Sequence, residues 1–263
     1  MADFGAQTHP GCQEQSNEDS VGWDTMRGVW LVADGMGGHA NGEVASRVVK
    51  DTILDRVAHG VPLRESVIEA HRAVVEAAES SADSAAMGST VVAMKAGAES
   101  CDVVWVGDSR AYLWRKGKIR RLSRDHSLLE LLLASKQVSE AEARVHPKRH
   151  VVLQTLGMGE PTPDEISVDL RSRDWFLLCS DGLTDELTDD ELAERLESST
   201  SPKQAADSLL AAALNKGARD NVSVLVVDFG RRGFVLDPRW IPLALGILGA
   251  LALFLVLRWL ELG

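Results

Sequence analysis

The sequence has only three cysteines, which argues against a protein held together by disulfides or by cysteine-bound metals. Cys12, Cys101 and Cys179 are an odd number and lack the spacing of a metal-binding motif. Two of them lie in or beside apolar runs, where a thiol behaves as a small core residue. We therefore expect reduced cysteines in a cytosolic domain and no disulfide framework.

Positive charge is also scarce, since the formal net charge is -11 at pH 7. Such a surface repels the phosphate backbone of nucleic acids. The densest basic stretch, residues 115–121, reads as a solvated hairpin, so nucleic acid is excluded as a partner. A phosphate-binding P-loop is excluded as well, because no Gly-Lys-Ser or Gly-Lys-Thr follows a glycine run.

The N-terminus lacks the basic and apolar regions of a signal peptide, so we expect the chain to start in the cytoplasm. Near the other end, residues 241–257 carry no charge. With the flanking tryptophans this run is long enough to span a bilayer, whereas a buried core helix is usually shorter. Arginines before the run favour a cytoplasmic N-terminal part. We predict a basic linker at 231–239, a transmembrane helix at 240–260, and single-pass membrane localisation with the catalytic domain in the cytoplasm.

The rest of the sequence shows helical and strand patterns in groups. Apolar residues at helical spacing predict helices at 42–60, 62–80, 127–145, 189–197 and 202–216. Runs of β-formers predict strands at 29–34, 90–94, 102–106, 111–114, 119–122, 166–168, 175–179 and 222–229. The strands between 90 and 122 predict one antiparallel meander. The chain begins with a short apolar-poor stretch, and an acidic turn follows at residues 13–20. Paired helices and hairpin-connected strands indicate an α+β layered fold.

Acidic residues recur where the apolar runs begin or end. One Asp-Gly pair is most often only a hairpin turn. Here, however, the pattern recurs at Glu18-Asp19, Asp34-Gly35, Asp108, Asp181-Gly182 and Asp220. Carboxylates gathered at the ends of central strands would repel one another unless cations neutralised them. Carboxylates and carbonyls without matched His or Cys suit Mg²⁺ or Mn²⁺.

The same positions belong to six ordered motifs. They are Asn17-Glu18-Asp19, Asp34-Gly35-Met36-Gly37-Gly38-His39, Gly88-Ser89-Thr90, Gly107-Asp108-Ser109-Arg110, Ser180-Asp181-Gly182-Leu183 and Asp220-Asn221-Val222-Ser223. In this order they resemble the bacterial metal-dependent serine/threonine phosphatases of the PP2C (PPM) family over about residues 5–229. The resemblance implies a four-layer α-β-β-α sandwich of two antiparallel sheets flanked by helix pairs, over residues 1–230. It also implies a flap at about 127–150.

The resemblance implies two Mn²⁺ or Mg²⁺ ions and a third, weaker one seen in bacterial relatives. The implied metal ligands are Glu18, Asp34, Gly35, Asp108, Asp181 and Asp220. Asp34 would bridge the two ions, with Glu18 and the Gly35 carbonyl on one of them and Asp181 and Asp220 on the other.

The remaining implied roles concern the third ion and the attack on phosphorus. Asp108 and Asp181 would hold the third ion, and Asp19 would orient metal-bound waters. A metal-bridging water would attack the phosphorus of phosphoserine or phosphothreonine. The implied partners are phosphorylated proteins, the targets of a Ser/Thr kinase.

Two positions depart from the family pattern. Glu14 stands where most relatives carry an Arg that grips the substrate phosphate. Unless Glu14 faces away, another cation must replace that Arg, and Arg110 and Lys148 are candidates. Met36 stands where eukaryotic members have a His, which leaves the acid for the leaving group unassigned. His39 is a candidate for this acid, but we favour a structural role for it in the turn.

We predict a membrane-bound enzyme that hydrolyses phosphoserine and phosphothreonine in proteins. The rival is a membrane-tethered, phosphatase-like binding or scaffold protein whose catalysis is impaired by Glu14. The complete set of metal carboxylates favours the enzyme, because buried acids without metals would be costly. A cysteine-based phosphatase is excluded, since no Arg stands six residues after any of the cysteines.

Overall fold

The computed structural model describes residues 2–80, 87–139, 142–143 and 146–230. The chain divides into two units by its internal contacts: Met1–Gly230 is one compact unit, and Arg231–Gly263 is the other. The predicted basic linker, 231–239, and the predicted transmembrane helix, 240–260, lie outside the described residues. Within the described part, no helix has the length and apolar character needed to cross a membrane.

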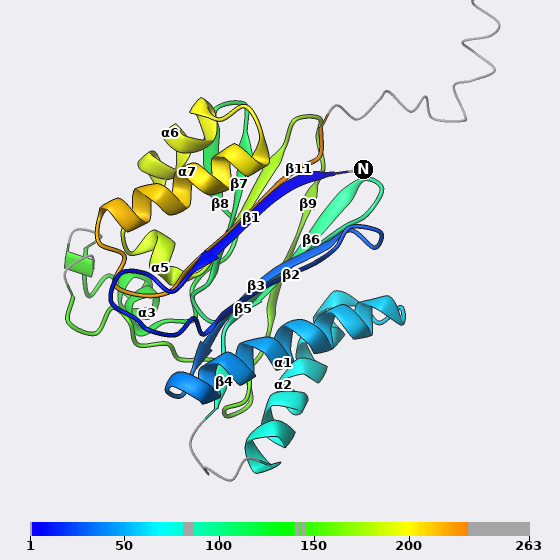
Figure 1. Ribbon diagram of the computed structural model, residues 1–263, viewed down its shortest axis with the longest axis vertical. Coiled ribbons are helices and arrows are strands. Elements are labelled where there is room, and N and C mark those ends of the chain that lie inside the picture. The colour runs from blue at the N-terminus through cyan, green and yellow to red at the C-terminus, as the bar shows by residue number, and fades with distance from the viewer. Residues whose placement is uncertain (1, 81–86, 140–141, 144–145, 231–263) are drawn as a thin grey trace, which may run out of the picture. The chain divides into compact units, whose positions relative to one another are not determined.

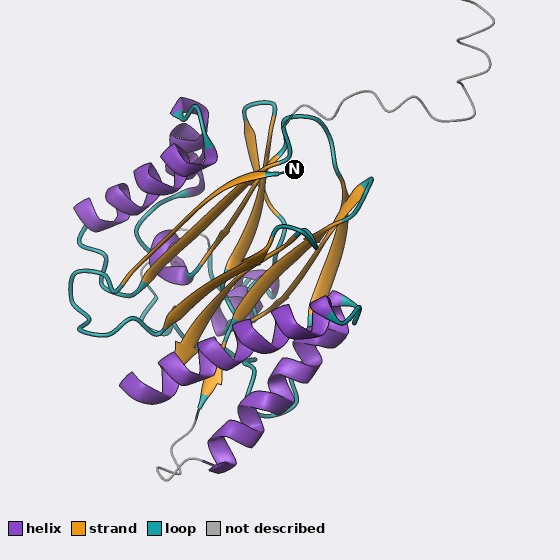
Figure 2. Ribbon diagram, turned by 45° about the vertical axis from the view of Figure 1, so that its right-hand side comes forward, coloured by secondary structure: helices purple, strands orange, loops and turns teal. Residues whose placement is uncertain are grey.

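The strands form two antiparallel sheets (Figure 2). The first sheet contains β1 (Asp3–His9), β7 (Arg110–Arg115), β8 (Lys118–Arg121), β10 (Trp175–Cys179) and β11 (Val222–Asp228), in the order β1-β11-β10-β7-β8. The second sheet contains β2 (Asp19–Asp24), β3 (Val29–Met36), β5 (Val91–Ala96), β6 (Ser100–Val106) and β9 (Asp164–Asp169), in the order β2-β3-β5-β6-β9. A short strand, β4 (Gly88–Ser89), pairs with the end of β3.

Helices cover the outer face of each sheet (Figure 1). The long helices α1 (His39–Ala58) and α2 (Leu63–Ser80) pack together beside the second sheet. The helices α5 (Asp181–Thr184), α6 (Asp189–Ser198) and α7 (Pro202–Asn215) lie on the first sheet. The sequence sets the starts of the last two: Thr188 and Glu191 form a capping box at α6, and Ser201 caps α7 before Pro202.

Three apolar clusters hold these layers together. One fills the space between α1, α2 and the second sheet, and includes Val49 and Leu31. A second lies between α6, α7 and the first sheet, and includes Leu209. The third lies between the two sheets, where Trp30 and Phe176 are almost fully buried. Helix, sheet, sheet and helix therefore stack as four layers, which confirms the predicted α+β arrangement.

Two edge strands were not predicted. Residues 3–9 form β1, although the sequence there reads as an apolar-poor start, because the backbone pairs along the apolar strand β11. Residues 19–24 form β2, which pairs with β3 from Asp19 opposite Asp34 to Asp24 opposite Val29. Edge strands need little apolar character of their own, so their sequence pattern is weak.

The predicted single meander from 90 to 122 is wrong. β5 pairs with β6 and β7 pairs with β8, but β6 pairs next with β9 and β7 with β10. The chain therefore crosses from the second sheet to the first between β6 and β7. Gly107 makes this crossing in a left-handed conformation with φ 104°, and Asp108 follows it.

Two helices differ in extent from their predictions. The helix predicted at 127–145 is α3 (Leu128–Ala134), which starts at Ser127, whose Oγ accepts a hydrogen bond from the Glu130 N–H at 3.2 Å. It ends at Ala134, and Lys136 adopts a left-handed turn with φ 56°. The helix predicted at 42–60 starts earlier, at His39, directly after Gly38.

Candidate metal centre

Asp19 and Asp34 face each other at one edge of the second sheet. Asp19 is the first residue of β2, and Asp34 stands near the end of β3 as its register partner. The Asp19 side chain is buried, with 7% of the residue exposed. Like charges directly opposite on neighbouring strands destabilise a sheet, so this pair needs a compensating partner.

Ser180 connects this pair to the first sheet. Its hydroxyl donates a hydrogen bond to Asp19 Oδ2 at 2.8 Å and accepts one from the Ser223 N–H at 2.9 Å. Ser180 directly precedes α5, whose first residue is Asp181. Asp181 is therefore held beside Asp19, at the place where the two sheets meet.

Asn221 fixes the loop that carries Glu18. Its Oδ1 accepts a hydrogen bond from the Glu18 N–H at 2.6 Å, and its Nδ2 donates to the carbonyl oxygens of Pro10 and Ser16 at 3.0 Å each. Asn221 is itself buried and follows Asp220 directly. The amide side chain thus joins the loop of Glu18 to the chain that carries Asp220.

Two glycines let the start of α1 approach the same place. A Cβ at Gly42 would overlap the carboxylate of Glu18, and one at Gly35 would overlap the Gly42 carbonyl. The helix therefore packs its backbone directly against β3 and against Glu18. Sequence reasoning identified Gly35 but missed Gly42, which looks like an ordinary residue at the start of a helix.

Asp108 reaches the same edge through the crossing between the sheets. Thr90 Oγ1 accepts a hydrogen bond from the Asp34 N–H at 3.3 Å and lies 2.7 Å from Ser109 Oγ. These hydroxyls tie β3 to the residue that follows Asp108. Asp108 is 8% exposed.

The pKa values of four of these carboxyl groups, those of Asp19, Asp34, Asp108 and Asp181, are raised. Burial raises the pKa of Asp19 to about 7, and the charges of Asp220 and Glu18 add to the effect, whereas hydrogen bonds from Ser223 and Ser180 oppose it. Burial, and after it Asp125, raises the pKa of Asp108 to about 7. The pKa values of Asp34 and Asp181 lie well above the usual range because of burial and of the neighbouring aspartates.

This cluster fits divalent cations. Among the described side chains, Asp19 and Asp181 each keep a buried Oδ1 that has no hydrogen-bond partner. An unpartnered buried carboxylate oxygen is costly, and a cation removes that cost together with the mutual repulsion. The donors are carboxylate and carbonyl oxygens, which suits Mg²⁺ or Mn²⁺.

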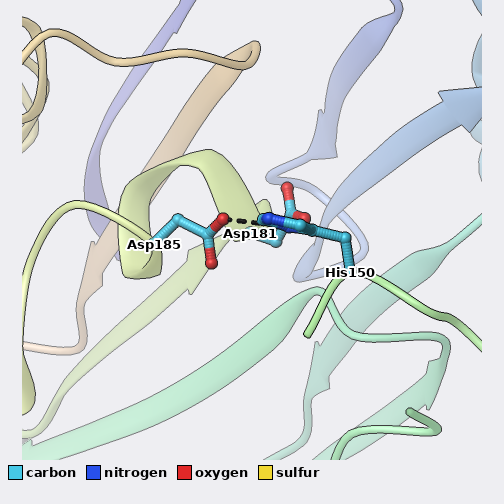
Figure 3. A group of neighbouring side chains, drawn as sticks. All are labelled: His150, Asp181 and Asp185. Atoms are coloured by element: carbon cyan, nitrogen blue, oxygen red, sulfur yellow. Dashed lines mark ion pairs between the residues drawn. The ribbon is translucent and has the colours of Figure 1, made fainter. Parts of the chain in front are cut away.

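His150 and Asp185 extend the cluster on the side of the flap. Figure 3 shows the ion pair between them, with 3.2 Å from His150 Nδ1 to Asp185 Oδ2, and Asp181 beside it. The three residues offer one potential ligand atom each within 4.8 Å of one another. Sequence reasoning missed both. The only signal was the spacing of four residues between Asp181 and Asp185, which places them on one face of a helical turn.

A cavity of about 1250 Å³ leads to this edge. Asp108 and Asp181 line it at one end, and residues of α3 and of the loop before α6 form its walls. A second cavity of about 190 Å³ is lined by His150, Arg219 and Asp220, among others. Asp108 and Asp181 therefore line an opening whose walls include residues of the predicted flap, and Asp220 lines the smaller cavity.

The predicted phosphate-binding residues are less well placed. Glu14 is exposed in the loop between β1 and β2, and Lys148 is exposed in a turn near the end of the predicted flap. The Arg110 guanidinium donates to both carboxylate oxygens of Asp125, at 2.7 Å from Nη2 and 3.1 Å from Nε. Arg121 donates to the same carboxylate. A phosphate would therefore have to displace Asp125 to bind Arg110.

The predicted acid, His39, is the first residue of α1. Its side chain lies outside the described part of the structure. Its role therefore stays a prediction.

Fold and site together define a metal-dependent phosphatase. The sequence pattern of the family "Protein phosphatase 2C" matches residues 11–216. A serine/threonine phosphatase, stp, of Listeria monocytogenes is 36% identical over 209 residues, which are 75% of this chain and 83% of that protein. The chain therefore belongs to the protein phosphatase 2C family and is a serine/threonine phosphatase.

Solved structures agree with this assignment. The serine/threonine phosphatase PstP/Ppp of Mycobacterium tuberculosis superposes with a TM-score of 0.79 at 32% identity, over 88% of this chain and 99% of that chain. The catalytic domain of PstP in complex with two manganese ions has a TM-score of 0.77 at 30% identity, over 86% of this chain and 97% of that chain. The family depends on Mn²⁺ or Mg²⁺, in agreement with the donor set found here.

Proposed function

We propose that this chain hydrolyses phosphoserine and phosphothreonine in proteins at the cytoplasmic face of a membrane. The observation that carries the hydrolytic part is the carboxylate cluster, in which buried oxygens of Asp19 and Asp181 have no hydrogen-bond partner among the described residues. The membrane part rests on the uncharged run at 241–257 and the basic linker before it.

The chain offers ligands for two Mn²⁺ or Mg²⁺ ions. Asp34 would lie between them, with Glu18 and the Gly35 carbonyl on one side and Asp181 and Asp220 on the other. When bound, such ions lower the pKa of a shared water that can attack phosphorus, and they neutralise the charge of the phosphate. A third ion would use Asp108 and Asp181.

The protein's own residues arrange what surrounds the ions. Asp19 is held by the Ser180 hydroxyl and presents its free Oδ1 as an acceptor for a water at the centre. Asn221 keeps the loop of Glu18 against the first sheet. The phosphorylated segment of the substrate enters through the large cavity between α3 and the start of α6. Because a carboxylate stands at Glu14, the phosphate binds another cationic side chain. Arg219 is a candidate, since it lines the small cavity together with Asp220.

The substrates are proteins phosphorylated by a Ser/Thr kinase, as the activity of the family requires. A rival proposal, in which the domain only binds phosphoproteins, predicts metal binding without turnover. A measurement of the rate of hydrolysis distinguishes the two proposals, whereas a measurement of binding does not.

The test is hydrolysis of a phosphothreonine peptide by the full chain in mild detergent, with Mn²⁺ varied from zero to saturation. We expect turnover that depends on Mn²⁺ and is lost in Asp34→Asn. The matched control is Asp51→Asn, at an exposed aspartate of α1, which should behave as the parent. Mn²⁺ binding without any turnover in the parent would overturn the proposal in favour of a binding protein.

A further inference from the structure

The last described residue, Gly230, lies at the end of the strands opposite the metal centre. β11 runs from Val222, next to the metal-binding edge, to Asp228, which is about 20 Å away at the usual rise per residue. Gly230 is fixed there, because its carbonyl accepts hydrogen bonds from the Arg173 N–H at 2.8 Å and from Ser172 Oγ at 3.3 Å. The chain thus leaves the domain at the end remote from the cavity.

The tip of the β2–β3 hairpin lies at this same end (Figure 1). Aromatic rings connect it to the exit of the chain. Phe229 packs against Trp30 with ring centroids 6.0 Å apart, and Trp30 is the register partner of Trp23 on β2. Trp23 in turn packs against Phe4 of β1 at 5.1 Å. The hairpin tip and Gly230 therefore belong to one face of the domain, which we call the exit face.

Apolar side chains are unusually exposed on the exit face. Met26, at the hairpin tip, is 87% exposed and Trp23 is 44% exposed. The other large apolar residues exposed in the described part of the chain lie in or beside the flap, at Leu131, Val151 and Leu153. Trp23 is partly exposed to solvent. A tryptophan in this position is favourable at the interface of a bilayer, where its amphipathic ring lies at the level of the headgroups.

Basic residues are exposed at this end of the strands. Arg171 and Arg173 lie in the loop between β9 and β10, where the Arg173 N–H bonds to the Gly230 carbonyl, and Lys116 and Lys118 lie at the turn from β7 into β8. Within the described residues none of the four forms an ion pair. Exposed acids share the exit face, namely Asp3, Glu99 and Asp169. The face is therefore of mixed charge, although the whole chain carries -11. An acidic protein can approach anionic lipid headgroups only by such a face.

The length of the linker restricts which face can reach a bilayer. Residues 231–239 separate Gly230 from the proposed transmembrane helix, and about nine extended residues span at most roughly 30 Å. The exit face is thereby kept near the headgroups at an effective concentration on the order of millimolar. Even weak contacts are then occupied for much of the time.

We propose that the exit face is a membrane-contact surface, with Trp23 and Met26 in the headgroup region and Arg171 and Arg173 on lipid phosphates. The inference rests on the proposed membrane anchor and adds an orientation to it. The metal centre then points away from the bilayer, so that the cavity is open to phosphoproteins of the cytoplasm and closed to lipid headgroups.

The experiment uses the full chain in vesicles of phosphatidylcholine and phosphatidylserine that contain a nitroxide-labelled lipid. The background is Cys12→Ser, because Cys12 is exposed while Cys101 and Cys179 are buried. A fluorophore is attached at Met26→Cys or, as the matched control, at Leu153→Cys, an exposed apolar position beside the flap. We expect the nitroxide to quench the label at position 26 at least about threefold more than the label at position 153, given an insertion depth of several ångströms.

A second variant tests the charges. Arg171→Glu with Arg173→Glu should reduce the quenching at position 26 about twofold or more, since each basic residue near an anionic surface contributes on the order of 1 kcal/mol. Hydrolysis of p-nitrophenyl phosphate should stay unchanged in this variant, which shows that the domain is folded.

Flotation of the vesicles shows whether a negative result concerns the membrane anchor or the contact face. If the full chain does not float with them, the proposed anchor is wrong and the contact face fails with it. If the chain floats and the two labels are quenched equally, the anchor stands and the contact face alone is overturned.

Discussion

Asp19 and Asp34 stand directly opposite each other on neighbouring antiparallel strands, and a buried carboxylate oxygen of Asp19 has no hydrogen-bond partner among the described residues. A sheet would normally avoid two acids in register. A divalent cation held by these carboxylates would neutralise their charges and use both as ligands. Without metal, the two carboxylates therefore destabilise the domain locally, and a bound cation would remove this destabilisation.

The position of Asp19 predicts that Asp19→Asn makes the metal-free protein more stable and weakens its binding of metal. At pH 8 the metal-free variant should unfold with a free energy about 1 kcal/mol higher than the parent, because a carboxylate disfavoured by burial and by neighbouring acids is replaced by a neutral group. The Ser180 hydroxyl keeps an acceptor in the asparagine. Affinity for Mn²⁺ should fall by about tenfold or more. Chemical denaturation in chelator and calorimetric titration with Mn²⁺ measure the two effects.

The control for this variant is Asp3→Asn, at an exposed aspartate of β1. It removes the same charge far from the metal centre and should change neither quantity. A metal-free Asp19→Asn protein less stable than the parent would show that repulsion is not the dominant effect at this pair.

Stability without metal should fall as the pH rises from 5 to 8. The folded protein raises the pKa of Asp19 and of Asp108 to about 7, from an ordinary value of 3.8. Between these values the folded state holds protons that the unfolded state has released, so the free energy of unfolding decreases with pH. The loss is at most about 1.4 kcal/mol per pH unit and per group, and it levels off above pH 7.

Metal should reverse this trend, because ligation requires the deprotonated carboxylates. Denaturation at pH 5, 6, 7 and 8, with chelator and with saturating Mn²⁺, gives both curves. Equal slopes in the two series would contradict the assignment of these carboxyl groups to the metal centre.

Glu14→Arg should strengthen the binding of phosphorylated substrate. Glu14 is exposed in the loop that Asn221 holds beside the metal centre. The longer, cationic side chain of arginine therefore fits there without a change in the packing of neighbouring residues. A charge-assisted bond to phosphate is worth about 1.5 kcal/mol, which corresponds to a KM lowered about tenfold at nearly constant kcat. Glu14→Gln separates loss of the negative charge from gain of the cation. An unchanged KM in both variants would place position 14 outside the phosphate site.

Asn221→Ala should weaken both the fold and the metal site. The substitution leaves the Glu18 N–H and the carbonyls of Pro10 and Ser16 without their partner, at a cost of about 2–3 kcal/mol in unfolding free energy. The Glu18 N–H then loses its hydrogen bond to Asn221, so Mn²⁺ affinity should fall as well. Asn215→Ala, at the exposed end of α7, is the control and should change neither. Unaltered Mn²⁺ affinity in Asn221→Ala would show that Glu18 is held by other contacts.

The sequence predicted those parts of the protein that have a local signature. Apolar strands that stop at aspartate, such as the run ending at Asp34, were visible because burial and a tight turn both restrict composition. The paired helices were visible for the same reason. β1 and β2 were not, since an edge strand is stabilised by the partner to which it pairs and its own residues are weakly restricted.

The supporting residues of the site were missed for a different reason. Ser180 and Asn221 occur in the recognised motifs, but their roles depend on hydrogen bonds to residues more than 150 positions away. The partner of Arg110 is nearer in sequence, since Asp125 is 15 positions away, but no spacing rule predicts that its carboxylate accepts from the Arg110 guanidinium. Side-chain pairing across a sheet interface is a property of the assembled layers and leaves no local pattern.

The position of β11 has a consequence for how the protein is made. This strand is the last in the described chain, yet it lies in the sheet between the first strand, β1, and β10. A ribosome-bound chain therefore holds an open gap in its first sheet until residues 222–228 have emerged. Asp220 and Asn221 directly precede this strand, so the carboxylates assigned to the metal centre are complete only when residues 220–228 have been synthesised. Metal binding at this site is therefore expected only after the first sheet has closed.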